Sequence, residues 1–131
     1  MAGYPWHALE LSCPLVPPSA GGRFVLCHGN GMKSIQRVCL VDDKGHVVKT
    51  AVGTFHSHTQ LAVTDAGFVL VLDAATMRVL LLDPDLGHVR DVVTAEHGRL
   101  NKPRHMHWDD VNSRLYVAEA AGRLVVFQLT P

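Results

Sequence analysis

The feature that most limits the possible folds of this chain is an internal repeat of about 45 residues. Three short apolar runs recur behind a turn residue: GRFVLCH at 22–28, GFVLVLD at 67–73 and SRLYVAE at 113–119. The second run begins 45 residues after the first, and the third begins 46 residues after the second. A fixed period of this length is typical of β-propellers, in which each unit forms one four-stranded blade.

A second set of runs follows in the same order and carries an arginine at one fixed position. The runs are QRVCLVD at 36–42, MRVLLLD at 77–83 and GRLVVFQ at 122–128, with the arginines Arg37, Arg78 and Arg123. Recurrence in register favours a structural role, in which each arginine anchors a blade turn by bonding carbonyls or the preceding acid. The alternative is a basic arc that binds acidic ligands or phosphates.

Further extended segments complete each unit. WHALEL, TQLAVT and HMHWDD precede the three units, and related segments follow from Gly45 and Gly87. All these runs are short and bounded by Gly, Asp, Asn or Pro, and none has the three-to-four spacing of an amphipathic helix. The sequence therefore predicts an all-β fold.

The predicted architecture is a partial β-propeller of about three four-stranded antiparallel blades, the last lacking its outer strand. We expect one half-propeller over residues 1–131, with approximate blades at 4–55, 56–98 and 99–131. Long loops are expected only in the first unit, at 13–22 and 29–34, because the other connections are no longer than turns require.

Aspartates close the turns between these runs. DDKG at 42–45 and DPDLG at 83–87 place Asp and Gly where a tight hairpin needs capping or a positive φ. Turn capping explains the spacing of the aspartates without any reaction. The aspartates assigned to it are Asp42, Asp65, Asp73, Asp83 and Asp109.

The second and third units combine a turn, a Gly- or Ser-led apolar run that ends in an acid, and an arginine-led run. The residues that carry this pattern are Thr64 to Gly67, Asp73, Arg78, Pro103, Asp109, Tyr116, Glu119 and Arg123. Together with the first unit from Gly22 onward, they resemble the NHL repeat of six-bladed propellers, which often form the C-terminal part of tripartite-motif proteins. The resemblance implies a propeller that selects protein substrates for ubiquitin transfer. No RING, B-box or coiled-coil segment accompanies it in this sequence, so ligase activity is not assigned to the chain.

Three units are half of what an NHL domain carries, so the chain resembles the C-terminal half of such a propeller. Half a propeller would leave two apolar blade faces uncovered, and the third strand of its last blade would offer unpaired backbone groups. A second copy related by a two-fold axis would close a six-bladed ring, and another polypeptide could supply the missing half instead. We therefore expect a non-catalytic protein-interaction module that associates with itself, as a homodimer, or with a second half.

Charge and cysteine content limit the partners and the cellular location that we expect. Twelve basic and twelve acidic residues balance, so nucleic acid is not expected as a partner, although Arg99, Lys102 and Arg104 cluster. A single-stranded RNA-binding propeller is kept as an alternative. Three cysteines cannot all pair within one chain, and the N-terminus does not resemble a secretory signal, so we expect buried free thiols and a cytoplasmic protein without a membrane anchor.

Nine histidines raise a metal hypothesis. His56 with His58, and His105 with His107, are His-x-His pairs, and alternate residues of a strand point to one side and can share a cation. No carboxylate recurs beside them at a ligand position, so the pairs remain only the basis of an alternative function, a metal-dependent hydrolase or lyase. No activated Ser or Cys nucleophile is found either. We predict no enzyme activity, no metal and no cofactor, and we identify no small-molecule substrate.

The aromatic residues provide the candidate contact surface. Trp6, Phe55 and Trp108 are the candidates for exposed aromatics, and Trp108 aligns with an apolar strand position that favours the core. Trp6 is placed by the repeat near the entrances of the first strands of each unit. The predicted binding surface there consists of Trp6, Arg104, His105 and His107.

Overall fold

The computed structural model describes residues 23–29, 35–53, 55–56, 59–93 and 100–129, and these form β-strands joined by turns, with no helix among them. Three antiparallel sheets result. Sheet A contains β1 (Phe24–Gly29), β2 (Ile35–Val41), β3 (Val47–Thr50) and the short β4 (Phe55–His56), which pairs with the start of β2. Sheet B contains β5 (Thr59–Val63), β6 (Val69–Asp73), β7 (Arg78–Leu82) and β8 (His88–Val93). Sheet C contains β9 (Pro103–Asp109), β10 (Arg114–Glu119) and β11 (Leu124–Gln128).

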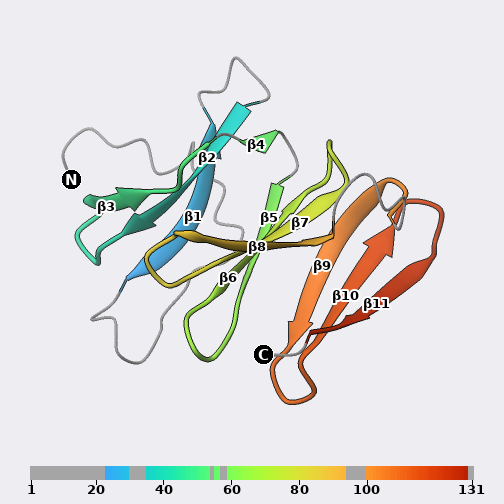
Figure 1. The fold of residues 1–131 in the computed structure, drawn as a ribbon. Helices are drawn as coiled ribbons and strands as arrows, with labels where there is room; N and C mark the ends of the chain where they lie inside the picture. Colours follow the sequence, from blue (N-terminus) through green and yellow to red (C-terminus); the bar gives the residue numbers. More distant parts are fainter. Residues whose placement is uncertain (1–22, 30–34, 54, 57–58, 94–99, 130–131) are drawn as a thin grey trace.

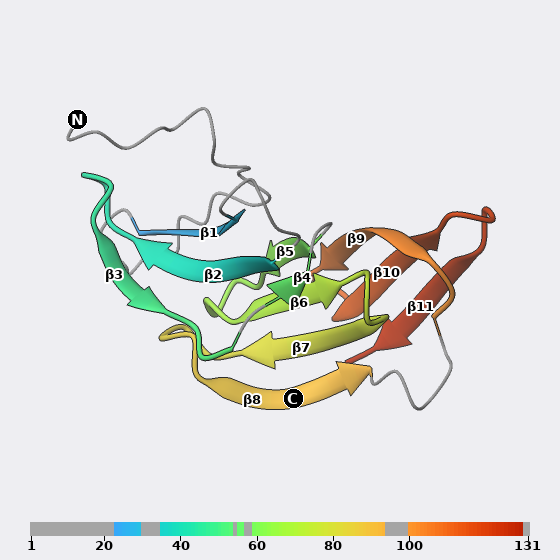
Figure 2. The same cartoon turned by 90° about the horizontal axis from the view of Figure 1, so that it is seen from above.

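The three sheets stand side by side like the blades of a partial propeller (Figure 1). Within sheets B and C the strands pair in sequence order, and the first strands of neighbouring sheets meet, β5 with β9 and β1 with β5 (Figure 2). The all-β propeller prediction is confirmed, and the third sheet has three strands among the described residues. The strand predicted at 6–11 lies outside the described part of the chain.

Each pair of neighbouring sheets encloses one hydrophobic cluster. Strand β6 contributes side chains to both clusters. Val69 and Val71 face sheet A, and Leu70 and Leu72 face sheet C. All four side chains are fully buried. A strand covered on both faces needs apolar residues at every position, which accounts for the run VLVL.

The far face of sheet A is also covered. Leu26, Cys39 and Val41 point away from sheet B, form a cluster of their own, and are at most 2% exposed. The expectation of two bare blade faces is therefore wrong for sheet A at these positions. Phe55, which the sequence placed among the candidate exposed aromatics, is 3% exposed and belongs to the cluster between sheets A and B.

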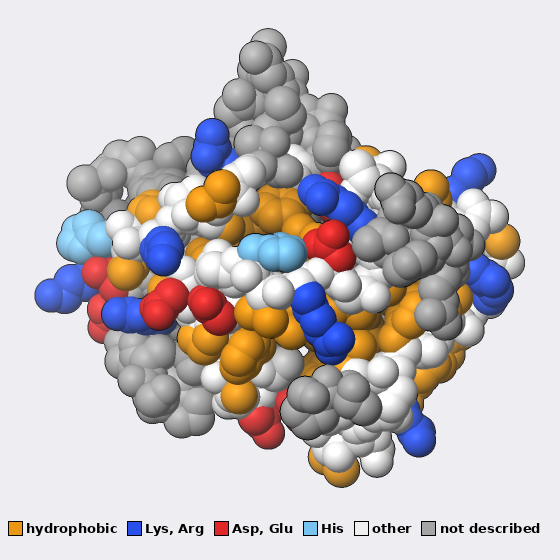
Figure 3. Space-filling view, viewed as in Figure 1, with side chains coloured by type: hydrophobic (Ala, Val, Ile, Leu, Met, Phe, Trp, Pro, Cys, Tyr) orange, Lys and Arg blue, Asp and Glu red, His pale blue; other side chains and the backbone are white. Residues whose placement is uncertain are grey.

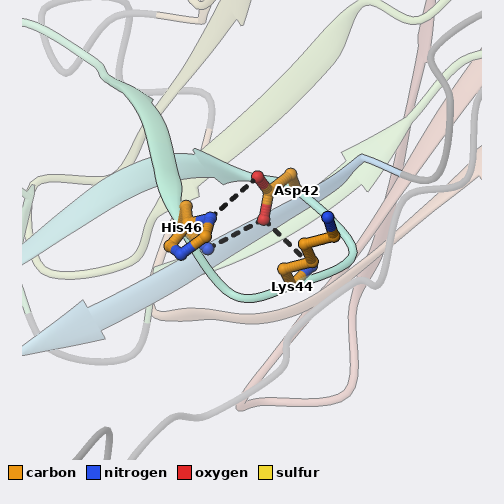
Figure 4. Close-up of polar contacts among 3 residues, drawn as sticks. All are labelled: Asp42, Lys44 and His46. Carbon is orange, nitrogen blue, oxygen red and sulfur yellow. Dashed lines mark hydrogen bonds and ion pairs between the residues drawn. The ribbon is translucent and has the colours of Figure 1, made fainter. Parts of the chain in front are cut away.

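Aspartates cap equivalent turns in sheets A and B with the same geometry. Asp42 Oδ1 accepts bonds from the backbone N–H groups of Lys44 and His46, at 2.9 and 2.8 Å (Figure 4). Asp83 Oδ1 accepts them from Asp85 and Gly87, two and four residues on, at 2.8 and 2.9 Å. The predicted capping role is confirmed for Asp42 and Asp83.

In the sequence repeat Gly45 is matched with Gly87, but these hydrogen bonds show that Gly87 is equivalent to His46, one residue later. The positive φ falls on Gly45 in the first turn (84°) but on Leu86 in the second (66°), whereas the sequence suggested Gly87. Leu86 is 3% exposed in the core between sheets A and B, and this burial offsets the strain of a positive φ. Gly87 is needed for space, because a Cβ there would lie 2.8 Å from Asp83 Oδ2.

Candidate functional site

Gln60 joins sheet B to the free edge of sheet C. Its Oε1 accepts the backbone N–H of Met106 at 3.0 Å, and its Nε2 donates to the carbonyl of Arg104 at 2.7 Å. The side-chain amide thereby replaces one backbone unit of a missing neighbour strand and satisfies part of the β9 edge. Nε2 also lies 3.1 Å from His105 Nδ1, so Gln60 fixes the inner strand that carries the predicted contact residues.

Those predicted residues are only partly brought together. Arg104, His105 and His107 are all exposed on β9, and Trp6 lies outside the described residues. His105 and His107 alternate and so share one side of sheet C, whereas Arg104 has the opposite parity. His107 lies beside Tyr116 of its own sheet, with ring centroids 6.3 Å apart.

The side of sheet C that faces away from sheet B is open. Cross-strand pairing sets His107 beside Tyr116 and Val126, and His105 beside Ala118 and Leu124. We call these six residues the open face. Leu124 is 58% exposed and Val126 is 47% exposed, and hydrophobic side chains reach the surface over this part of the molecule (Figure 3).

The outer edge of β11 adjoins the open face. Glu119 donates its N–H to Arg123 O at one end of the β10–β11 ladder, and Leu129 donates to Ser113 O at the other. The register between them has no bulge, so Val125 and Phe127 turn their backbone groups toward β10. The N–H and C=O groups of Leu124, Val126 and Gln128 therefore point away from the sheet.

Two of the three recurrent arginines make ion pairs with the acid at the end of the preceding strand. Arg123 is bidentate on Glu119, with its Nη2 2.9 Å from Oε2, and Arg78 Nη2 lies 3.8 Å from the fully buried Asp73. The Arg123 hydrogen bond is the main cause that holds the pKa of Glu119 below its usual value. The anchoring role is confirmed for Arg78 and Arg123, and Asp73 is an ion-pair partner where the sequence suggested a turn cap.

A cleft of about 730 Å³ opens between sheets B and C at the end that carries the β5–β6 and β9–β10 turns. Most of its lining is apolar, supplied by Phe68, Leu70, Leu81, Val89, Trp108 and Leu129. Asp65, Asp110 and Arg90 are the charged residues that line it. Trp108, predicted to belong to the core, packs against the cluster between these two sheets and also forms part of the cleft wall.

Asp65 and Asp110 form a carboxylate pair in this cleft. Asp110 Oδ1 accepts the Trp108 indole N–H at 2.6 Å and the Asp65 backbone N–H at 3.0 Å. The Asp110 charge is the main cause that raises the pKa of Asp65 above its usual value, followed by a side-chain hydrogen bond to the same residue. The predicted turn-capping role of Asp65 is not borne out among the described residues, because the side chain that accepts a backbone N–H in this turn is Thr64, whose Oγ1 lies 3.1 Å from Phe68 N.

Sequence reasoning missed Asp110, and the repeat contained the signal that could have found it. Asp65 and Asp110 are 45 residues apart, so they occupy the same position in successive units. Asp109, one residue earlier, accepts the backbone N–H groups of Val111 and Asn112 and is a turn cap as predicted. The two adjacent aspartates of one turn thus have different roles.

The histidine and cysteine predictions have separate outcomes. Among the described residues no three His, Cys, Asp or Glu side chains are grouped to hold a metal, and His58 lies outside those residues. Cys27 and Cys39 are buried and outside any disulfide, as predicted, and burial is the largest cause that raises the pKa of Cys39. The described part of the chain contains no helix that is both long and apolar enough to cross a bilayer.

Comparison with models of known protein families gives no match for this chain. Comparison with curated proteins likewise gives no relative. The resemblance to NHL repeats stays a prediction from the motifs themselves.

Proposed function

We propose that this protein is a non-catalytic protein-interaction module that associates with a second copy of itself through sheet C. The observation that supports it is the composition of β11, whose sequence LVVFQ is apolar on both faces. Val125 and Phe127 are used in the cluster between sheets B and C, while Leu124 and Val126 lie on the open face. Exposed apolar side chains favour association when they lie beside a strand edge, and no described strand other than β10 pairs with β11.

A two-fold axis near Val126 would pair the outer edge of β11 and cover its exposed apolar side chains in one contact. The outward backbone groups of Leu124, Val126 and Gln128 would pair antiparallel with the same groups of the second copy. Val126 would then lie opposite itself, and Leu124 opposite Gln128 of the partner subunit. Such an isologous contact is closed and forms dimers, because each copy offers the edge that the other needs.

The test is the mass of the protein in solution. Wild-type protein is expected to be a dimer by sedimentation equilibrium and by light scattering. Val126→Pro removes the outward N–H, which an edge strand tolerates, and is expected to give a folded monomer. Val126→Thr keeps the N–H and the β-branched shape, so it is the matched control and should still dimerise.

Leu124→Glu is a second variant that leaves the backbone intact and places two like charges beside the contact. It is expected to weaken the dimer while the far-ultraviolet circular dichroism stays that of a β-protein. A wild-type chain that is folded and monomeric at every concentration would contradict the proposal. So would a dimer that both Val126→Pro and Leu124→Glu leave unchanged.

A further inference from the structure

The cleft between sheets B and C has the size and lining of a binding site that is separate from the open face. About 730 Å³ is within the range of about 300–1,000 Å³ that small-ligand pockets occupy. Phe68, Leu81 and Leu129 give it an apolar wall, so an occupant must offer a hydrocarbon portion. The dimer contact proposed above involves the other side of sheet C, and the inference does not depend on it.

The charged part of the cleft points to a cation. Asp65 and Asp110 come from the turns of two different sheets, and the Asp65 backbone N–H lies 3.0 Å from Asp110 Oδ1, which brings the two residues together. Two carboxyl groups so close repel one another when both are ionised, and a bound cation removes that repulsion. Asp110 is held in place by the Trp108 indole and by the Asp65 backbone N–H, so the pair needs little ordering to accept a ligand.

The apolar lining of the cleft favours an organic cation over a metal ion. A metal ion would gain nothing from the apolar wall, and no group of three or more ligating side chains occurs among the described residues. A lysine side chain has an aliphatic stem that covers apolar surface and an ammonium head that donates three hydrogen bonds. Trp108 adds an aromatic wall, which attracts ammonium groups.

We propose that this cleft binds a lysine side chain of a partner polypeptide, with its stem against Phe68, Leu81 and Leu129 and its ammonium group on Asp65 and Asp110. Trp108 lies beside the ammonium position and orients Asp110. Arg90 lines the same cleft from β8.

The inference is tested by titrating the protein with two short capped peptides, leucine–lysine–leucine and its glutamine counterpart. The readout is the indole N–H signal of Trp108 in nuclear magnetic resonance spectra, assigned with a Trp6→Phe variant. The lysine peptide is expected to shift this signal in a saturable way, and the glutamine peptide to bind about tenfold more weakly, as loss of one charged hydrogen bond predicts.

Variants locate the site. Asp65→Asn is expected to weaken the lysine peptide about tenfold, and Asp110→Asn to do the same while it still accepts the indole and backbone bonds. Asp85→Asn is the matched control, because it removes an equal charge from an exposed turn at the same end of sheet B without lining the cleft.

Equal binding of the lysine and glutamine peptides would overturn the proposal. Equal weakening by Asp85→Asn and Asp65→Asn would also overturn it, because the effect would then be one of net charge. A lysine peptide that leaves the Trp108 signal unmoved in wild-type protein would do so as well.

Discussion

Sheets B and C come from successive units of one repeat, yet their strands are buried in different ways. The middle strand β6 of sheet B is buried at all five positions, because sheets A and C cover its two faces. The corresponding strand β10 of sheet C alternates, with Leu115 and Val117 fully buried and Tyr116 and Ala118 partly exposed. Burial on both faces produces a continuous apolar run, and burial on one face produces alternation.

The strands that follow, β7 in sheet B and β11 in sheet C, differ: β7 fits this relation between burial and sequence, and β11 does not. Strand β7 has the apolar run VLLL, and both of its faces pack in clusters. Strand β11 has the similar run LVVF, but its residues Leu124 and Val126 face solvent. The composition of β11 is therefore that of a strand covered on both faces, and this mismatch is the reason to expect a partner at sheet C.

The largest expected effect contrasts one leucine in each sheet. Leu72→Ala in β6 removes a fully buried side chain from the cluster between sheets B and C, so unfolding should become easier by about 3 kcal/mol. Leu124→Ala removes the same atoms from a side chain that is 58% exposed, and its effect should stay within about 0.5 kcal/mol.

Urea unfolding of both variants, followed by circular dichroism at a concentration where the chain is monomeric, makes this comparison. Equal losses of stability would mean that the open face is covered within a single chain. The difference between sheets B and C would then have no consequence for association.

A smaller effect is expected where the two sheets are joined by a side chain. Gln60→Ala removes the bonds to the Met106 N–H and the Arg104 carbonyl, and should lower the free energy of unfolding by about 1–2 kcal/mol. Gln60→Glu keeps the acceptor and loses the donor, so it should fall between wild type and Gln60→Ala.

Hydrogen exchange of the Met106 amide sharpens this test. The amide should exchange faster in Gln60→Ala than in Gln60→Glu, while amides at the centre of β6 keep their relative protection. If the Met106 amide is equally protected in both variants, Gln60 does not hold the edge of β9.

Much of this fold could be predicted from the sequence because it depends on local pattern. The 45-residue period, the apolar runs and the turn aspartates are properties of neighbouring residues, and they correctly placed the strands of sheets B and C. The caps on Asp42 and Asp83 and the ion pairs of Arg78 and Arg123 likewise depend on residues at most five positions apart.

The candidate site was harder to predict because it depends on contacts between units. Gln60 bonds to Met106, 46 residues away, and Asp65 bonds to Asp110, 45 residues away. The residues next to Gln60 and Asp65 in the sequence give no sign of these contacts. The positive φ of Leu86 was missed for another reason. Its strain is compensated by burial in the core, which a turn motif does not record.

The smallest expected effect concerns the two equivalent aspartates, one from each sheet. The pKa of Asp65 is raised in the folded protein, mainly by the Asp110 charge, so the protonated form is favoured there more than in the unfolded chain. The stability linked to Asp65 is therefore fully present below its ordinary pKa of 3.8 and is lost as the pH rises through the raised value.

Asp110→Asn should remove this loss. Its side-chain oxygen still accepts the Trp108 indole and the Asp65 N–H, and its amide can donate to the Asp65 carboxylate, so only the repulsion disappears. The variant should have a slightly higher urea midpoint than wild type at neutral pH, and the gain should vanish in acid, where Asp65 is protonated in both proteins. Asp85→Asn, which removes an exposed charge nearby, should show no such pH dependence. A gain that persists unchanged in acid would mean that Asp65 and Asp110 do not share a charge interaction, and it would remove the basis for the lysine site as well.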